Sequence, residues 1–403
     1  MSFGVWRSAL RLCVVAALAL AGGAGCRRAA PTPAAAPPTV LRIATSGDYA
    51  PFSFTSDGMR RGLDVEIGAR LAGDLDRRAE FVSVAWPDLA AAAQRGAFDI
   101  AMGGVTMRAD RALAGQYTRP YATVGAVALV RGAYADRFPS VDALDRPGVR
   151  IAVNAGGHLE RVARARFPHA TIDAVPDNRA VPKRLLVGKA DAVVSDSAEV
   201  RDWQRPEWRV LGPFTFDHKA YLLPAGQEQL ALRVDEWLVA READGWLDGE
   251  RVQWLGPAAR MDAAAAGREA VAALMRLRLD LMPAVAAAKR AAGLPLVDTA
   301  QESHVIERVR GLSARPAHTE AVYRQLIELA KSVQRAAPAA PNGASLVALR
   351  DAIARIDVPL VRELDRTPGG DVEVWQPVLV RSLDMPGVAP PDIAQLARTL
   401  GET

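Results

Sequence analysis

The distribution of hydrophobic and polar positions divides the chain near residue 260. Between Val40 and Pro257, short apolar runs alternate with segments whose apolar residues recur at helical spacing. The run LRIATS predicts a strand, LDVEIGARLAGDL predicts a helix, and FDIAMGGV and VRIAVNAGG predict two further strands that run into glycines. Such alternation of strands and helices is typical of α/β folds with largely parallel sheets.

Beyond about Arg260 the strand patterns disappear. Ala, Leu, Arg and Glu recur at helical spacing in GREAVAALMRLRLDLM, ESHVIERVRGL, EAVYRQLIELAKSVQ and SLVALRDAIARIDVPLVREL, which are separated by Gly- and Pro-rich breaks. We therefore predict an all-helical second domain. We expect its last segment, VEVWQPVLVRSLDMPGVAPPDIAQLARTL, to hold a short strand-like piece and a terminal helix that serve packing.

The N-terminus has the pattern of an export signal. Two arginines precede an apolar stretch from Leu12 to Ala21, and small residues follow as far as GAGC. The stretch is too short for a spanning helix, so we expect a signal peptide at residues 1–25. GAGC resembles a bacterial lipoprotein cleavage box with Cys26 as the lipidated residue, and plain cleavage with a free Cys26 is the alternative. Residues 26–39 then form a Pro- and Ala-rich tether, and the protein is expected to be periplasmic and anchored to the membrane through Cys26.

Composition and charge argue against nucleic acid as a partner and against a disulfide or a metal site. The chain has 403 residues, of which 50 are basic and 46 are acidic. Four of the basic residues and none of the acidic ones lie within residues 1–28, so the rest of the chain is neutral and nothing indicates nucleic acid as a partner. The mature chain keeps at most one cysteine and its histidines are scattered, so we expect no disulfide and no metal. The sequence contains no feature that defines an oligomeric state.

Polar residues follow each predicted strand of the first domain, at the positions where parallel sheets bind ligands. They are Asp48, Thr106, Asn154 and Asp196. In the stretch ADAVVSDSAEVRDW, a second carboxylate, Glu199, stands three residues after Asp196. From the residues alone, this pair is a clamp for an ammonium group, a proton donor in a dry pocket, or the solvated first turn of a helix.

The segments TSGDYAPFSF, WPDLAAAAQRGAFDIAMGGVTMRADR, QYTRPY and DNRAVPKRLLVGKADAVVSD together resemble the periplasmic amino-acid-binding protein superfamily, whose type II members are two-lobed α/β proteins. The resemblance implies that Arg111 binds a ligand carboxylate, a role that suits a planar guanidinium with two parallel donors. It also implies a domain at residues 40–257, with lobe 1 at about 40–128 and 224–257 and lobe 2 at about 129–223.

Within that superfamily, GDYAPFSF, VNAGG, VPDN, SDSAEVR and HKAYLLP resemble the cyclohexadienyl dehydratases, secreted enzymes that act on prephenate and arogenate. The resemblance makes Glu199 the general acid of a decarboxylating dehydration that needs no cofactor. A carboxylic acid can protonate the leaving hydroxyl near neutral pH only if burial raises its pKa, by up to about 3–5 pH units. The substrate-binding residues implied are Asp48, Trp86, Thr106, Arg111, Asn154, Gly157, His158, Asp196 and Lys219.

The resemblance leaves two positions of this candidate site, His158 and Asp196, with more than one possible role. His158 and Leu159 follow the double glycine where the dehydratases have small polar residues, so His158 either replaces a side-chain donor to a carboxylate or serves only the structure. Asp196 corresponds to the ammonium ligand of the binding proteins, which arogenate could use. Prephenate has no ammonium group, and Lys219 would then balance the charge of Asp196.

The segments RLRLDLMPAVAAAKRAAGLPLVDTAQES, VYRQLIELAKSVQ and LRDAIARIDVPLVREL resemble the secreted, all-helical chorismate mutases, which implies a mutase-like domain at residues 262–403. Rearrangement of chorismate to prephenate needs no nucleophile, because positioning and charge stabilisation suffice. The resemblance makes Lys289 and Gln334 catalytic, with Gln334 donating to the ether oxygen of the substrate. The residues implied to bind substrate are Arg278, Glu302 and Arg350.

Spacing supports part of this second site. Arg278 and Lys289 are eleven residues apart, close to three helical turns, so they share a helix face, and Pro283 between them is expected to kink the helix. Gln301 stands where the family has a substrate-binding arginine, and Ala330 stands where it has a hydroxyl residue. Both departures weaken the expected binding of chorismate.

The two resemblances fit one another, because the product of the second domain is the substrate of the first. We therefore predict a two-lobed α/β domain followed by an all-α chorismate-mutase-like domain, together forming a bifunctional exported enzyme of phenylalanine biosynthesis. Its partners would be small molecules: chorismate, prephenate and arogenate. The alternative is an amino-acid-binding lipoprotein for transport or sensing with a mutase-like tail, a protein that has no evident need for an acid at Glu199. In a third reading the helical half only stabilises the assembly.

Overall fold

The computed structural model describes residues 39–339 and 343–402. The expected signal peptide, the tether and Cys26 lie outside the described residues. Contacts group Thr39–Thr403 into one unit. No helix within the described residues is long and apolar enough to cross a membrane.

Lobe 1 is built on a five-stranded sheet with the strand order β5-β1-β6-β15-β7. Its strands are β1 (Thr39–Thr45), β5 (Arg77–Ser83), β6 (Ile100–Ala101), β7 (Gly115–Tyr117) and β15 (Leu222–Pro224). Strand β1 runs parallel to β5 and β6, whereas β15 runs antiparallel to β6 and β7. A separate three-stranded sheet contains β2 (Asp48–Tyr49), β3 (Ser53–Ser56) and β4 (Met59–Arg61).

Helices cover both faces of the lobe 1 sheet because successive side chains of a strand point to opposite faces. Leu41 and Ile43 of β1 belong to the buried cluster that includes α2 (Leu63–Asp74), α8 (Glu228–Ala243) and α9 (Trp246–Leu255). Ala44 belongs to the cluster that includes α3 (Leu89–Gln94). The strands predicted for LRIATS and FDIAMGGV and the helix predicted for LDVEIGARLAGDL are therefore confirmed as β1, β6 and α2.

Lobe 2 repeats the design with the strand order β11-β10-β12-β9-β13. Its strands are β9 (Ala126–Arg131), β10 (Arg150–Asn154), β11 (Thr171–Val175), β12 (Ala192–Asp196) and β13 (Trp208–Leu211). Ile151 and Val153 of β10 share a buried cluster with α5 (His158–Arg166), and Ala152 shares another with α6 (Val181–Leu186). The short helix α7 (Val200–Trp203) follows β12.

Two extended segments connect the lobes and pair with each other in antiparallel fashion. They are β8 (Ala122–Val124), which leads into β9, and β14 (Asp217–Lys219), which leads back to β15. Lys219 also forms an isolated bridge with Thr106, so the returning segment is held against the loop that follows β6. This paired segment is called the hinge below.

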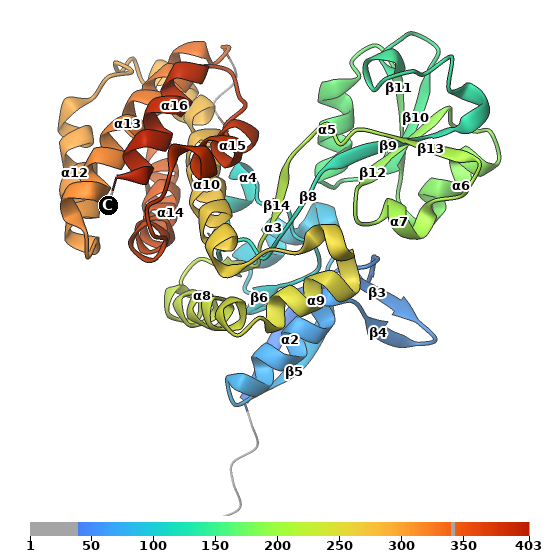
Figure 1. Cartoon of the computed structure of the whole chain (residues 1–403), viewed down its shortest axis with the longest axis horizontal. Helices are drawn as coiled ribbons and strands as arrows, with labels where there is room; N and C mark the ends of the chain where they lie inside the picture. The colour runs from blue at the N-terminus through green and yellow to red at the C-terminus, as the bar shows by residue number, and fades with distance from the viewer. Residues whose placement is uncertain (1–38, 340–342, 403) are drawn as a thin grey trace, which may run out of the picture. The chain divides into compact units, whose positions relative to one another are not determined.

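The described residues beyond Met261 form helices joined by short loops (Figure 1). The helices are α10 (Ala263–Asp280), α11 (Met282–Ala291), α12 (Thr299–Leu312), α13 (Pro316–Ala336), α14 (Leu346–Arg366), α15 (Val372–Ser382) and α16 (Pro390–Gly401). We call α10 to α16 the helical domain. The expected kink near Pro283 coincides with the single residue that separates α10 from α11.

The strand-like piece expected in the last segment is wrong, because that piece lies in α15. The alternating apolar residues of VEVW suggest a strand, but the buried residues of this segment are Trp375, Val378, Leu379 and Ser382. These positions recur at intervals of three and four residues, which places them on one face of a helix. The terminal helix expected after it is α16.

A buried ion pair joins α8 to α9 in lobe 1. The Nη1 and Nη2 atoms of Arg251 lie 2.6 and 2.8 Å from the two carboxylate oxygens of Glu242, and both side chains are almost fully buried. Arg251 also donates to the carbonyl of Tyr121, beside the hinge, and to the carbonyl of Met261, just before the helical domain. One side chain therefore connects α8 and the segment before the helical domain to Tyr121, which lies 130 residues away in the sequence.

Replacement of Arg251 by alanine should lower the free energy of unfolding by about 3–5 kcal/mol, because it leaves the Glu242 carboxylate buried without its partner. Denaturation followed through the fluorescence of Trp237 and Trp246, which lie in the same two helices, would measure the change. Arg78→Ala removes an exposed pair with Glu80 and should cost less than about 1 kcal/mol. Equal losses in the two variants would contradict the prediction.

Candidate active sites

A cleft of about 420 Å³ lies between the two lobes. Its lining consists of Tyr49, Trp86, Gly104, Thr106 and Arg111 from lobe 1, Asn154, Gly157, His158, Leu159, Asn178 and Glu199 from lobe 2, and Lys219 from the hinge. Most of the residues proposed from the sequence are thus brought together. Asp48 and Asp196 are the two that do not line the cleft.

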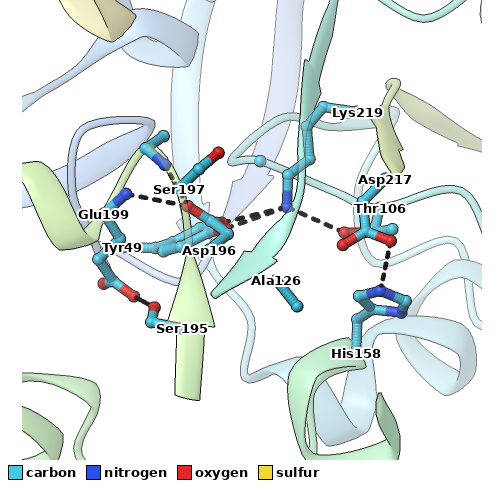
Figure 2. Close-up of polar contacts among 12 residues, drawn as sticks. Tyr49, Thr106, Ala126, His158, Ser195, Asp196, Ser197, Glu199, Asp217 and Lys219 are labelled. Atoms are coloured by element: carbon cyan, nitrogen blue, oxygen red, sulfur yellow. Dashed lines mark hydrogen bonds and ion pairs between the residues drawn. The ribbon is translucent and has the colours of Figure 1, made fainter. Parts of the chain in front are cut away.

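Glu199 lies in the turn between β12 and α7. Asp196 Oδ1 accepts hydrogen bonds from the backbone N–H groups of Ala198 and Glu199, at 3.0 and 2.9 Å, and so fixes this turn. Ser195 Oγ and Asn178 Nδ2 donate to the two carboxyl oxygens of Glu199, and Figure 2 shows the bond from Ser195. Glu199 is only 2% exposed, which rules out the solvated first turn of a helix.

The environment of Glu199 favours its neutral form. Burial raises the pKa of Glu199 well above its usual value, and the nearby charge of Asp196 raises it further. The hydrogen bonds from Ser195 and Asn178 act in the opposite direction and lower it in part. A protonated carboxyl group is what proton donation to a substrate requires.

Lys219 supplies a buried positive charge next to these carboxyl groups. Its Nζ atom donates to Thr106 Oγ1 at 2.9 Å and to Tyr49 Oη at 3.0 Å, and it lies 3.5 Å from Asp196 Oδ2 (Figure 2). The rings of Tyr49 and Phe52 lie within cation–π distance of Nζ. Burial raises the pKa of Asp196, whereas the charge of Lys219 lowers it.

Arg111 lies on α4 (Ala109–Ala112) and is 3% exposed. Its Nη1 atom donates to the carbonyl of Thr106 at 3.3 Å, and its guanidinium group lies 5.7 Å from the ring centre of Trp86. Tyr117 Oη donates to the same carbonyl at 3.1 Å. The ring of Trp86 and the carbonyl of Thr106 therefore fix the guanidinium group where it lines the cleft.

His158 lines the cleft at the start of α5, but its ring is engaged by the hinge. Its Nε2 atom lies 3.0 Å from Asp217 Oδ1, as Figure 2 shows, and Thr215 Oγ1 donates to the other carboxylate oxygen of Asp217. Burial alone would raise the pKa of Asp217, but the hydrogen bond and charge of His158, with the charge of Lys219, hold it below its usual value. An ionised Asp217 thus orients His158.

The residues that sequence reasoning missed in this cleft are Tyr49, Gly104, Leu159 and Asn178. Tyr49 and Asn178 lie within the quoted segments GDYAPFSF and VPDN, so a signal for both was present. Asn178 links the lobes, because its Nδ2 atom donates to the carbonyl of Asp48 at 3.3 Å as well as to Glu199. That dual role depends on contacts between segments 130 residues apart.

A second cleft, of about 1000 Å³, lies within the helical domain. It is lined by all five residues proposed from the sequence, namely Arg278, Lys289, Glu302, Gln334 and Arg350. Gln301 and Ala330, the two departures from the family pattern, also line it. Four of the cleft's other lining residues, Asp298, Arg308, Lys331 and Asp351, are charged and were not proposed.

A buried carboxylate organises the cations of this cleft. Asp357 of α14 is fully buried and accepts hydrogen bonds from Arg278 Nε and Tyr323 Oη, both at 3.0 Å. Arg308 of α12 donates to its second oxygen. Arg308 stands seven residues after Gln301, two turns along the same face of α12, which is the signal that could have identified it.

Three further cations of the second cleft, Lys289, Arg350 and Lys331, have partners of opposite charge or a backbone partner. Lys289 Nζ donates to the carbonyl of Leu296 at 2.5 Å, and burial lowers its pKa. Arg350 Nη2 lies 3.0 Å from Asp298 Oδ2, and Lys331 lies 3.4 Å from Glu302. Within the described residues, no group of three or more His, Cys, Asp and Glu side chains could hold a metal ion.

Comparisons with known proteins match both parts of the chain. Residues 41–257 match the family model of the bacterial extracellular solute-binding proteins, family 3, and residues 268–335 match chorismate mutase type II. Cyclohexadienyl dehydratase of Pseudomonas aeruginosa (strain PAO1) is 37% identical over 222 residues, which are 54% of this chain and 82% of that protein. A probable histidine-binding protein of Neisseria gonorrhoeae is 28% identical over 257 residues, 62% of this chain and 94% of that protein.

The crystal structure of an ancestral amino acid-binding protein, described as a precursor of cyclohexadienyl dehydratase, matches with a TM-score of 0.52 at 32% identity. The match covers 54% of this chain and 95% of that one. Small, amino-acid-like molecules are the ligand class that these relatives indicate for the cleft between the lobes. The chain therefore belongs to the bacterial extracellular solute-binding proteins of family 3, with a helical domain that matches chorismate mutase type II.

Proposed function

We propose that the chain is a bifunctional enzyme of phenylalanine biosynthesis. The helical domain converts chorismate to prephenate, and the solute-binding domain converts prephenate or arogenate to phenylpyruvate or phenylalanine. The observation that carries the proposal is the buried carboxyl group of Glu199, with its raised pKa, in a cleft that also holds Arg111 and Lys219. A carboxyl group with a raised pKa stays protonated near neutral pH and can donate its proton there.

In the dehydratase step, Arg111 binds the side-chain carboxylate of prephenate with its planar guanidinium group. Glu199 gives its proton to the ring hydroxyl as the C–O bond breaks, and water leaves. The ring carboxylate departs as CO₂, and the electrons of its C–C bond complete the aromatic ring. Glu199 is left as a carboxylate and takes a proton from solvent before the next turnover.

The position of Lys219 favours this reaction over simple capture of an amino acid. Asp196 is the residue that would bind a ligand ammonium group, but its Oδ1 atom is engaged by the turn and its Oδ2 atom faces Lys219. An ammonium group approaching Asp196 would meet the positive charge of Lys219. This arrangement therefore favours prephenate, a dicarboxylate without an ammonium group, over a free amino acid as the ligand of the cleft.

In the mutase step, cations hold the two carboxylates of chorismate and donors meet the charge that develops on its ether oxygen. Positive charge comes from Arg278, Lys289 and Arg350. Gln301 stands where the family has an arginine, and Arg308 supplies a further cation at the same cleft. Gln334 is 5% exposed, and its amide can donate to the ether oxygen without first being protonated.

We also propose that the protein is exported and acts in the periplasm, anchored through a lipid on Cys26. The family is one of extracellular proteins. The N-terminal pattern, an apolar stretch followed by GAGC, supports the anchor. Labelled palmitate incorporated by the wild-type chain and absent from a Cys26→Ala chain would test it.

Glu199→Gln should lower kcat for prephenate by about 10²–10⁴-fold, because the amide cannot donate the proton. The side chain keeps its size, so KM should change little. Phenylpyruvate absorbance in alkali measures the product. Asp202→Asn, an exposed acid on the neighbouring helix, is the matched control. Wild-type protein that folds and binds an amino acid tightly, yet never turns over prephenate, would favour the binding-protein alternative.

The pH profile of kcat should report the pKa of Glu199. Since the acid form is the active one, kcat should fall as pH rises through this raised pKa. Ser195→Ala removes a hydrogen bond that lowers the pKa, so the alkaline limb should move to higher pH. Steady-state rates across a pH series measure the shift, and a limb that stays in place or moves to lower pH would argue against Glu199 as the acid.

Gln334→Glu should make the mutase dependent on pH. The introduced carboxyl group can donate to the ether oxygen only when protonated, so kcat/KM for chorismate should fall about tenfold per pH unit above its pKa. The wild-type amide does not titrate and should give a flat profile over the same range. Chorismate consumption provides the measurement, and Gln395→Glu on the exposed face of α16 is the control. A flat profile for Gln334→Glu would exclude this role.

A further inference from the structure

The helical domain contacts the solute-binding domain beside both cations of the dehydratase cleft. Arg355 of α14 donates through Nη2 to the carbonyl of Ala112 at 3.1 Å, and Ala112 follows Arg111 directly. Glu269 of α10 lies with Oε2 3.2 Å from His218 Nε2, and His218 directly precedes Lys219. Each contact is thus one residue away from a cation that lines the cleft.

The contact of Arg355 bears on the orientation of Arg111. Helix α4 has four residues, so its carbonyl groups have few partners within the helix, and a guanidinium group at its carboxyl end both satisfies one and interacts favourably with the helix dipole. Ala112 and Tyr117 of lobe 1 also share one continuous buried cluster with Leu360 of α14. Helix α14 therefore supports the loop, the helix and the strand that present Arg111.

The contact of Glu269 bears on Lys219 in a similar way. Glu269 is itself held by Arg381 of α15 at 3.1 Å, and the guanidinium group of Arg381 lies 5.0 Å from the ring centre of Phe216. The carbonyl of His218 accepts a hydrogen bond from the N–H of Met107 at 3.0 Å. Glu269 therefore holds the hinge strand where Lys219 meets the loop after β6.

We propose that Arg355 and Glu269 are positioning residues of the dehydratase, supplied by the helical domain, which hold Arg111 and Lys219 in the geometry that binds the substrate carboxylates. Neither residue lines the dehydratase cleft, and neither lines the mutase cleft. The inference rests on the proposed function, because it concerns the same reaction. It makes the helical domain a structural part of the dehydratase site as well as a separate enzyme.

Loss of either contact is expected to raise KM for prephenate. The substrate carboxylates that Arg111 and Lys219 bind are charged before the reaction, so loosening these cations weakens ground-state and transition-state binding alike. The hydrogen bonds of Glu199 come from Ser195 and Asn178, and Arg355 acts beside Arg111, so loss of the Arg355 contact leaves the proton donor unchanged. Loss of either contact should thus raise KM for prephenate by roughly 5–30-fold. In Arg355→Ala kcat should change little, whereas in Glu269→Ala the displacement of Lys219 from Asp196 should also lower kcat.

The test compares the wild-type chain with Arg355→Ala, Arg355→Lys and Glu269→Ala in prephenate and chorismate kinetics. Arg355→Lys retains a cationic donor and should recover part of the loss. Arg362→Ala is the matched control, because Arg362 lies on the same helix and pairs with Glu236 of lobe 1 at 3.4 Å, in an exposed position away from the cleft. Mutase kcat/KM should be unchanged in every variant, which also reports that the helical domain is folded, and retained kcat for prephenate in the Arg355 variants reports the same for the solute-binding domain.

A raised KM in the Arg355→Ala and Glu269→Ala chains, with a wild-type KM in the control, is the expected result. If Arg355→Ala fails to fold, Arg355→Met keeps the aliphatic length without the donor and decides the question. An unchanged KM in Arg355→Met and Glu269→Ala, or an equal rise in Arg362→Ala, overturns the inference. Absence of prephenate turnover by the wild-type chain rejects the proposed function and this inference with it. Turnover with the same KM in the wild-type chain and in every variant rejects only the inference.

Discussion

The first cleft depends on one constraint. Two carboxyl groups that stand three residues apart, those of Asp196 and Glu199, are both buried away from water. Two carboxylates that close cannot both be charged at low cost. Burial raises the pKa of both groups. The charge of Lys219, 3.5 Å from Asp196 Oδ2, and the backbone N–H groups of Ala198 and Glu199 act against this at Asp196, whereas the charge of Asp196 raises the pKa of Glu199 further, so the proton is left on Glu199. The division of roles between these acids therefore follows from burial together with the placement of one lysine and one turn.

That lysine joins the two lobes. It comes from the hinge, donates to Thr106 and Tyr49 of lobe 1, and faces Asp196 of lobe 2. The loop of Gly104 is shaped to allow this approach, since Gly104 has a φ of +72° and a Cβ there would lie 2.4 Å from the ring of Tyr49. The charge balance that protonates Glu199 thus requires both lobes and the hinge to meet at Lys219.

Much of this could be predicted from the sequence, because strand ends and short motifs are local. Glu199 and Arg111 follow strands in recognisable segments, and the strands and most helices follow from hydrophobic spacing. The roles of residues that act through contacts across the fold could not be predicted in this way, even where a motif or a helical spacing gave a signal for the residue itself. Asn178 acts on Glu199 from a different loop, Arg308 reaches the second cleft from two turns beyond Gln301, and in α15 the three-dimensional packing of Trp375 overrode a strand-like alternation.

The two clefts use a buried carboxyl group in opposite ways, and α14 shows why they cannot be treated separately. Glu199 lacks a cation partner and is kept neutral, whereas Asp357 is surrounded by Arg278, Arg308 and Tyr323 and serves as their shared acceptor. Helix α14 carries Asp357 and, seven residues before it, Arg350, which lines the mutase cleft. Between them lies Arg355, which donates to the carbonyl of Ala112 at the carboxyl end of α4. Because these groups are fixed on one rigid helix, a shift of α14 that altered the mutase cleft would also displace the support of the dehydratase cleft.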